Sequence, residues 1–304
     1  MIKFPPEGYL IKRSENLEYL RSVEGLRKAM DNETILEAKA DMCTASHDLI
    51  VNLPCMNALI PREECAIGIS EGKTKDIAII SRVGRPVMFM VDGFTENQGK
   101  TAILSRRKAQ EKCISEYLSK LSSGEIIDAR VTHIEQFGCF VDIGCGIPSM
   151  IPIDEISVSR ISSPADRFTL GESIKVVYKG TDADKFYISH KELLGSWKEN
   201  AEMFSAGETV PGIVRSVESY GIFVELAPNL AGLAEPKEGV EVGQTASVYI
   251  KSINPGKMKI KLIIVDVSDT PIRFENRYFI TDGIIKRWQY SPERSSRLIE
   301  TVFQ

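Results

Sequence analysis

Two short stretches of the sequence place an aromatic residue, a glycine, one further residue and a phenylalanine in a row. The first stretch holds Phe137 and Phe140, and the second holds Tyr220 and Phe223. In a regular strand the two rings of each pair would point to opposite faces, because they are an odd number of positions apart. The glycine between them permits a bulge that turns both rings toward one surface. Two exposed rings on one surface can stack on unpaired bases, at about 1–3 kcal/mol per base.

The alternative interpretation is that both rings of a pair pack inside the protein. The same aromatic-Gly-x-Phe spacing occurs twice, at residues 137–140 and 220–223. This recurrence favours the exposed arrangement, since packing inside one core would not require the same element in two places.

The aromatic pairs belong to a longer internal repeat. Residues 129–144 and 212–227 align without gaps, and the flanking segments follow in the same order as alternating stretches separated by glycine turns. Each unit reads as five short strands in about 70 residues, which fits a small Greek-key barrel of the oligonucleotide-binding (OB) type. A weaker third copy at residues 33–112 has the same rhythm but lacks the aromatic element.

The sequence therefore predicts a mainly β chain of three tandem five-stranded OB-fold barrels joined by short helices, with a small helical N-terminal extension and an α/β C-terminal extension. Ser14, Ser22 and Ser291 predict helix starts in these extensions. The predicted boundaries are 1–32 for the N-terminal helical extension, 33–112 for a degenerate first barrel, 113–122 for a helical linker, 123–195 for the second barrel, 196–206 for a helical linker, 207–266 for the third barrel, and 267–304 for a C-terminal hairpin and helix.

The repeats resemble S1 RNA-binding domains, the repeat of bacterial ribosomal protein S1 and of short S1-like RNA-binding proteins. In the second barrel the resemblance is carried by "GEIIDARVTHIEQFGCFVDIGCGIPSMIPIDEIS" with "LGESIKVVYKGTDADKFYISHKEL", and in the third by "GIVRSVESYGIFVEL" with "VGQTASVYIKSI". It implies a single-stranded RNA site on the second and third strands, with help from the fifth. On this resemblance the aromatic pairs are the stacking rings, and the fifth-strand pair falls on Asp182 and Lys185, then on Asn254 and Lys259.

The sequence departs from that family in two respects. Family members commonly carry a histidine after the third strand, where this chain has Pro152 in the second barrel and Glu235 in the third. The first barrel lacks the aromatics, and its "ALIPREE" is similar to the leading repeats of ribosomal protein S1. The resemblance therefore implies modest RNA sites in the last two barrels and a docking role for the first.

Charge does not favour capture of nucleic acid by the whole surface. The net charge of the chain is −4, and residues 123–195 hold seven Lys or Arg against eleven Asp or Glu. Basic residues nonetheless gather late in each repeat, where they either follow a phosphate backbone or protect a solvated edge strand. The predicted RNA-binding residues are Phe137, Phe140, His133, Lys175, Lys179, Asp182, Lys185, Tyr220, Phe223, Arg215, Lys251, Lys257 and Lys259.

No catalytic motif is present: the sequence has no P-loop, no G-x-G-x-x-G after a strand, no H-E-x-x-H and no nucleophile elbow. Its six cysteines form no C-x-x-C pair, which predicts reduced buried thiols. The chain starts without a secretory signal pattern and has no apolar run that could span a bilayer. We therefore expect no enzyme, no cofactor and no metal.

The expected protein is a cytoplasmic monomer with no membrane partner. Its expected partner is single-stranded RNA, in particular mRNA, with the small ribosomal subunit as a further partner. The alternative is a protein-docking adaptor or a regulator of RNA metabolism that uses its barrels mainly for protein contacts.

Overall fold

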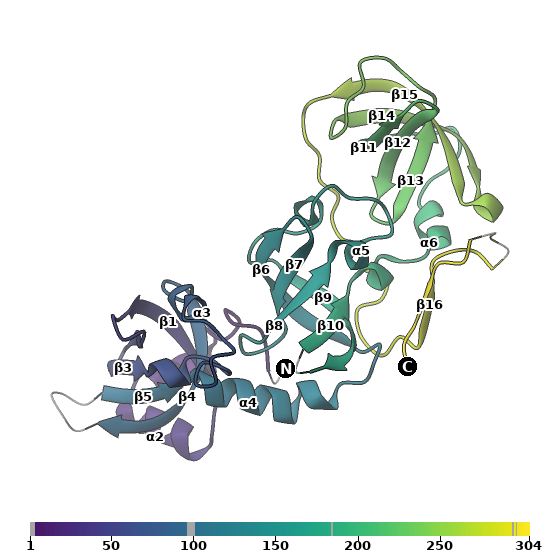
Figure 1. Cartoon of the computed structure of the whole chain (residues 1–304). Helices are drawn as coiled ribbons and strands as arrows, with labels where there is room; N and C mark the ends of the chain where they lie inside the picture. Colours follow the sequence, from purple (N-terminus) through teal and green to yellow (C-terminus); the bar gives the residue numbers. More distant parts are fainter. Residues whose placement is uncertain (1–3, 96–100, 184, 294, 296) are drawn as a thin grey trace. The chain divides into compact units, whose positions relative to one another are not determined.

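The computed structural model describes residues 4–95, 101–183, 185–293, 295 and 297–304. It contains three closed five-stranded barrels in sequence order, coloured purple to blue, teal and green in Figure 1, and so confirms the predicted fold. The chain divides into two compact units. The first unit comprises residues 1–121, 128–130 and 142–148, and the second comprises residues 122–127, 131–141 and 149–304.

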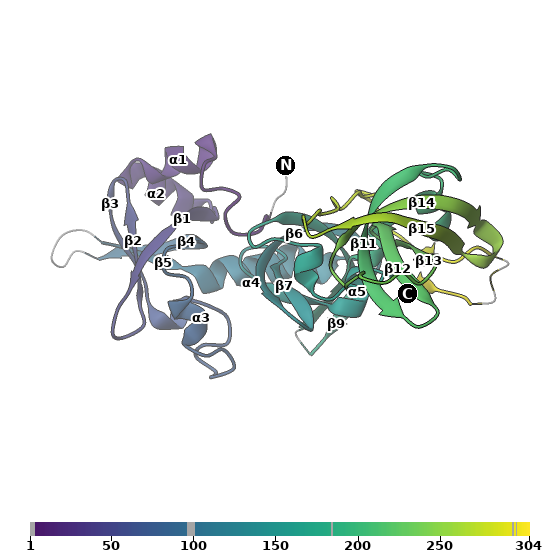
Figure 2. The same cartoon turned by 90° about the horizontal axis from the view of Figure 1, so that it is seen from above.

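The first barrel has the strand order β1-β2-β3-β5-β4. Its strands are β1 (Leu36–Cys43), β2 (Leu49–Leu53), β3 (Met56–Ile60), β4 (Pro86–Thr95) and β5 (Thr101–Ser105). Figure 2 shows its N-terminal helices α1 (Ser14–Leu20) and α2 (Val23–Asp31) on one side of the barrel and α3 (Ile77–Ile80) on the other. Ser22 caps α2 as predicted, because its hydroxyl accepts a hydrogen bond from the Gly25 amide at 2.9 Å. Ser14 is wrong as a cap, since the N-cap position of α1 belongs to Arg13.

The second barrel has the strand order β10-β8-β7-β6-β9. Its strands are β6 (Ile126–Glu135), β7 (Gly138–Asp142), β8 (Pro148–Pro152), β9 (Ser173–Asp182) and β10 (Lys185–Ser189). Short helical segments flank it: α4 (Arg106–Glu116), η2 (Leu118–Lys120), α5 (Ile153–Ile156), η3 (Pro164–Asp166), η4 (Lys191–Leu194) and α6 (Trp197–Ala201). A further turn, η1 (Arg62–Glu64), belongs to the first barrel. Ser196 starts α6 with a capping box to Glu199, which explains why this linker is helical.

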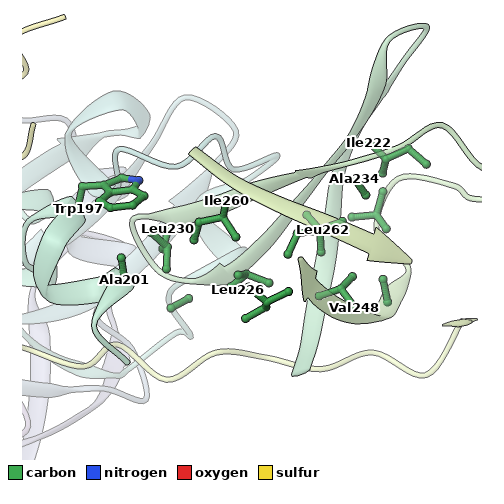
Figure 3. Packing of buried hydrophobic residues seen from close by; sticks show 14 of the residues in the cluster. Trp197, Ala201, Ile222, Leu226, Leu230, Ala234, Val248, Ile260 and Leu262 are labelled. Carbon is green, nitrogen blue, oxygen red and sulfur yellow. The ribbon is translucent and has the colours of Figure 1, made fainter. Parts of the chain in front are cut away.

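The third barrel has the strand order β11-β12-β13-β15-β14. Its strands are β11 (Thr209–Glu218), β12 (Gly221–Ala227), β13 (Leu230–Ala234), β14 (Thr245–Asn254) and β15 (Lys259–Ser268), with η5 (Pro255–Lys257) between the last two. Residues of β15 alternate between exposed and buried, as the "KIKLI" pattern requires. Figure 3 shows Leu262 and Val248 inside the barrel and Trp197 of α6 beside Leu230 at one end of the same core.

The C-terminal extension contains a two-stranded antiparallel sheet of β16 (Arg287–Gln289) and β17 (Glu300–Val302). The helix expected from Ser291 is wrong for the part of this stretch that the structure describes. The Ser291 hydroxyl accepts a hydrogen bond from the Ile299 amide at 3.0 Å, so it closes the turn between the two strands instead of capping a helix. Trp288 and Tyr290 are buried in a hydrophobic cluster that includes the core of the third barrel and also Val177 and Leu193. Across the described residues, no helix is long and apolar enough to cross a membrane.

Candidate nucleic-acid interface

The predicted aromatic pair of the second barrel lies on one exposed face. Phe137 occupies the turn before β7 with 58% of its surface exposed, and Phe140 lies on the outer side of β7. The two ring centroids are 6.1 Å apart and the planes meet at 88°. His133 of β6 brings a third ring within 6.1 Å of Phe140, while its Nε2 is 2.6 Å from a Glu135 carboxylate oxygen. The face therefore offers two edge-to-face phenyl rings and an imidazole ring to a flat ligand.

Gly138 acts differently from the bulge that the sequence suggested. Phe137 precedes the strand, so the alternation of strand faces does not apply to it. A Cβ atom at Gly138 would lie 2.6 Å from Met150 Sδ and 2.7 Å from the Ile151 carbonyl oxygen. The glycine is required because strand β8 approaches the backbone of β7 closely at this point.

The third barrel repeats this arrangement. Tyr220 is 66% exposed, and its ring centroid is 6.3 Å from that of Phe223 at an interplanar angle of 86°. Phe223 pairs with Leu233 on β13, and Leu233 pairs in turn with Lys261 on β15. The outer surface of three neighbouring strands therefore runs from an aromatic ring, across an aliphatic side chain, to an exposed ammonium group.

Tyr187 is an exposed aromatic residue that the sequence analysis missed. It lies on β10 with 49% of its surface exposed and pairs with Met150 on β8. A pocket of about 400 Å³ contains Tyr187, Met150, Lys179 and Pro152, the position where the family resemblance implies a histidine. The alternation in "KFYIS" could have revealed the ring, because Ile188 is buried and Tyr187 must then face outward.

The basic residues of the second barrel lie at several positions around this face. Lys179 forms an ion pair with Glu155, with 2.9 Å between its Nζ and a carboxylate oxygen. Asp182 and Lys185 are paired residues at the exposed tip of the β9–β10 hairpin. Lys175 is partly buried on β9, and its backbone amide donates to the Tyr278 hydroxyl at 3.3 Å. Among the described lysines of residues 123–195, Lys185 at the hairpin tip is the exposed one.

The third barrel presents its lysines more openly. Lys259 and Lys261 occupy alternate exposed positions of β15, while Lys257 precedes the strand in η5. Lys251 on β14 is exposed and lies 3.5 Å from a carboxylate oxygen of Glu235. The Asn254 side chain accepts a hydrogen bond from the Lys257 amide, so it holds the turn between β14 and β15. These lysines make the fifth strand the most basic edge of the face.

Arg215 is the predicted binding residue whose charge is already occupied. Its side chain is 7% exposed, with Nη2 2.6 Å from Glu225 and Nη1 3.0 Å from Asp166. A guanidinium between two carboxylates orders the protein and has little attraction left for a phosphate. The residue stays a prediction, and the geometry gives it a supporting place beside the aromatic pair.

His190 lies in the interior and is not part of the exposed aromatic face. The His190 side chain is buried, its Nδ1 lies 2.9 Å from the Ile156 carbonyl oxygen, and burial lowers its pKa to about 4. Among the residues that the structure describes, no group of three or more His, Cys, Asp or Glu side chains could hold a metal ion. The exposed rings and lysines of the face are suited to stacking and to charge attraction.

Comparison with known protein families identifies the domain family of the second barrel. Residues 120–191 match the S1 RNA binding domain. The second barrel is an S1 RNA-binding domain. This match confirms the resemblance on which the predicted S1 site was based.

The relatives are ribosomal proteins. The chain is 33% identical over 193 residues to the small ribosomal subunit protein bS1 of Leuconostoc lactis, covering 58% of this chain and 45% of that protein. It is 29% identical over 215 residues to a small ribosomal subunit protein bS1 homolog of Bacillus subtilis (strain 168), covering 60% of this chain and 56% of that protein. The chain thus spans about half the length of these curated relatives.

A solved structure of a multidomain protein with nucleic acid binding domains from Streptococcus pneumoniae TIGR4 aligns with 77% of this chain and 73% of that chain. The sequence identity is 14% and the TM-score is 0.25, so this overlap supports no statement about the arrangement of the barrels.

Proposed function

We propose that this S1-domain chain is a non-catalytic, cytoplasmic single-stranded RNA-binding protein that holds unstructured mRNA on its second and third barrels, in contact with the small ribosomal subunit. The observation that carries the proposal is the repeated ring geometry at Phe137–Phe140 and Tyr220–Phe223, with centroid distances of 6.1 and 6.3 Å. Bases of any identity can stack on such rings, which suits a protein that binds RNA without a fixed sequence. The relatives named small ribosomal subunit proteins support the ribosomal part of the proposal.

Each barrel alone offers a modest site. The acidic second barrel attracts phosphates weakly, and few exposed lysines lie beside its rings. Two linked sites on one RNA strand gain affinity because binding at the first raises the effective concentration at the second. We therefore assign the function to the pair of barrels.

The test is the affinity of a short fluorescent single-stranded RNA for the full chain and for the Phe140→Ala plus Phe223→Ala variant. Loss of two stacking contacts at about 1–3 kcal/mol each predicts at least about 30-fold weaker binding. Tyr249→Ala is the matched control, because it removes an exposed ring of β14 that lies outside both pairs. Unchanged affinity in the double variant would contradict base stacking.

A second candidate, a protein-docking adaptor, is favoured by one observation on the first barrel. Helix α3 exposes Ile77 and Ile80, which are 65% and 44% exposed, and Val83 follows them at the surface. The Ile77→Asp plus Ile80→Asp variant separates the two candidates in co-sedimentation with small ribosomal subunits. If the Ile77→Asp plus Ile80→Asp variant no longer co-sediments but binds RNA normally, protein docking is supported. If co-sedimentation is instead lost in the Phe140→Ala plus Phe223→Ala variant, the RNA proposal is supported.

A further inference from the structure

We propose that a groove beside Tyr220 and Phe223 binds one nucleotide of single-stranded RNA, whose base stacks on these rings and whose phosphate is held by Arg160 and Arg297. The inference rests on the proposed function and extends its site to a connecting loop and to the C-terminal extension. Both arginines lie outside the aromatic-Gly-x-Phe repeat. It gives the C-terminal extension a role in binding.

The groove has a volume of about 440 Å³ and lies entirely within the second unit. Four separate parts of the chain line it: the loop after α5, helix α6, the third barrel and the C-terminal extension. The lining residues used here are Arg160, Tyr220, Phe223, Arg297 and Ile299. A volume of this size suits a small ligand with a flat apolar part and a polar part.

Asn229 holds the walls of the groove in place. It is fully buried, with a left-handed φ of 66°, at the end of the β12–β13 turn. Its Oδ1 accepts hydrogen bonds from the Val158 amide at 2.7 Å and from the Ser157 hydroxyl at 3.0 Å. Its carbonyl oxygen accepts from the Tyr290 hydroxyl at 2.5 Å. One residue of the barrel thus fixes both the loop that leads to Arg160 and the extension that leads to Arg297.

This fixed framework matters for affinity. Ordering a loop upon binding costs free energy, and a site whose walls are already positioned avoids much of that cost. The Asn229 amide also donates to the Lys191 carbonyl oxygen at 2.9 Å, so its side chain is satisfied by buried partners. The groove is therefore formed before a ligand arrives.

The charges of the groove select an anion. Arg160 and Arg297 are exposed, and neither has an ion-pair partner among the residues described. Arg215 also lines the groove, but Glu225 and Asp166 already neutralise its guanidinium. Glu218 is the acidic residue of the lining, so two free guanidinium groups outweigh one carboxylate. A guanidinium matches a phosphate with two parallel hydrogen bonds, and aromatic rings match a base.

The experiment measures the affinity of a fluorescent oligouridylate for the full chain as a function of salt. The Phe137→Ala and Phe140→Ala changes are included in every variant so that the third barrel carries the binding. In this background we expect Arg160→Ala and Arg297→Ala each to weaken binding about tenfold. Each should also reduce the slope of log affinity against log salt by about 0.7, the value for one lost phosphate contact of a single strand.

Arg287→Ala is the matched control, because Arg287 is an exposed arginine of the same extension that pairs with Glu300 and does not line the groove. Affinity and slope unchanged in both Arg160→Ala and Arg297→Ala would overturn the inference. If Tyr220→Ala still abolishes binding in that case, the proposed function stands and only the inference fails. Loss of all binding in the background variant itself overturns the inference, because the third barrel then has no site. Competition by uridine monophosphate at the same concentration as the oligonucleotide would show a free nucleotide to be the ligand and would also overturn it.

Discussion

The second and third barrels bury an acidic residue at the same position of the repeat, Asp142 and Glu225, directly after the Phe-Val pair. Glu225 pairs with two guanidinium groups, those of Arg167 and Arg215. Asp142 instead accepts hydrogen bonds from backbone amides, those of Glu7 at 2.7 Å and Gly144 at 2.8 Å among them. Burial, and after it the nearby Glu7 carboxylate, together raise the pKa of Asp142 to about 7.

The difference shows that a duplicated strand position keeps its residue type while the surrounding chain decides its electrostatics. Both acids contact a segment that precedes their own barrel, residue 7 in one case and residue 167 in the other. In the third barrel this segment supplies the Arg167 guanidinium, whereas in the second it supplies the Glu7 backbone amide. The acid is therefore an ion-pair partner of two arginines in one barrel and an acceptor of backbone amides with a raised pKa in the other.

Of the changes at these two buried acids, Glu225→Gln should cause the larger loss in the free energy of unfolding. It leaves the guanidinium groups of Arg167 and Arg215 buried without their shared carboxylate, which predicts a loss of about 3–5 kcal/mol in the free energy of unfolding. Asp142→Asn removes an acceptor of backbone amides and predicts about 1–3 kcal/mol. Trp197 and Trp288 both lie in the second unit, so their fluorescence during urea unfolding reports on Glu225→Gln. A loss below about 1 kcal/mol would contradict the assigned role of the buried ion pair.

The sequence predicted the elements that follow local rules. Alternating residues, glycine turns and the duplicated frame were sufficient for three barrels, and the spacing at Phe137 and Tyr220 was sufficient for exposed ring pairs. The sequence did not predict that Arg215 is paired with Asp166 and Glu225. These partners lie at distances along the chain that no local pattern reveals.

The helix predicted in the C-terminal extension was wrong for a related reason. Ser291 before Pro292 has the local signature of a helix start, but pairing with Ile299 offers its backbone and hydroxyl better partners. The groove around Arg160 and Arg297 depends on Asn229, whose hydrogen bonds join segments about 70 residues apart. Such tertiary hydrogen bonds have no periodic signal in a single sequence.

Buried groups of the two units should also make opposite contributions to the pH dependence of stability. Burial lowers the pKa of His190 in the second unit to about 4, against about 6.5 in an unfolded chain. The stabilising effect of the neutral ring is complete above pH 6.5 and is lost as the pH falls toward 4. The loss amounts to about 3 kcal/mol in the free energy of unfolding. Tryptophan fluorescence at pH 7 and pH 4.5 measures it, and His190→Gln should flatten the difference.

In the first unit, Asp142 and Glu37 contribute with the reversed sign, whereas Glu7 has a lowered pKa. Burial is the largest cause that raises the pKa of Asp142 and of Glu37 to about 7. Each protonated carboxyl group therefore stabilises the folded state fully below about pH 4, the ordinary pKa of these groups, and this contribution is lost as the pH rises through 7. Hydrogen exchange of β1 amides, corrected for the intrinsic rate, should show more frequent opening at pH 8 than at pH 6. Equal protection at both values would show that these carboxyl groups are not buried as described.

The smallest expected effect concerns RNA binding at one position of the fifth strand, where one barrel has a ring that can stack and the other has a lysine that can contact a phosphate. Tyr187 on β10 and Lys261 on β15 are equivalent residues, since each pairs with an aliphatic residue of the third strand, Met150 or Leu233. Tyr187→Ala should weaken binding of a single-stranded RNA by about 1–3 kcal/mol without changing the dependence on salt, because a stacked ring neutralises no phosphate. Lys261→Ala should reduce the slope of log affinity against log salt by about 0.7.

The reciprocal variants, Tyr187→Lys and Lys261→Tyr, sharpen this test because they exchange the two side chains between exposed positions with the same strand neighbours. Tyr187→Lys should steepen the salt dependence of the second barrel, and Lys261→Tyr should make that of the third barrel shallower. If both exchanges leave the slopes unchanged, the fifth strand does not contact the RNA backbone, and the binding face is confined to the strands that carry the aromatic pairs. If the slopes exchange as expected, one substitution on a shared backbone is sufficient to convert a stacking position into a phosphate-binding position.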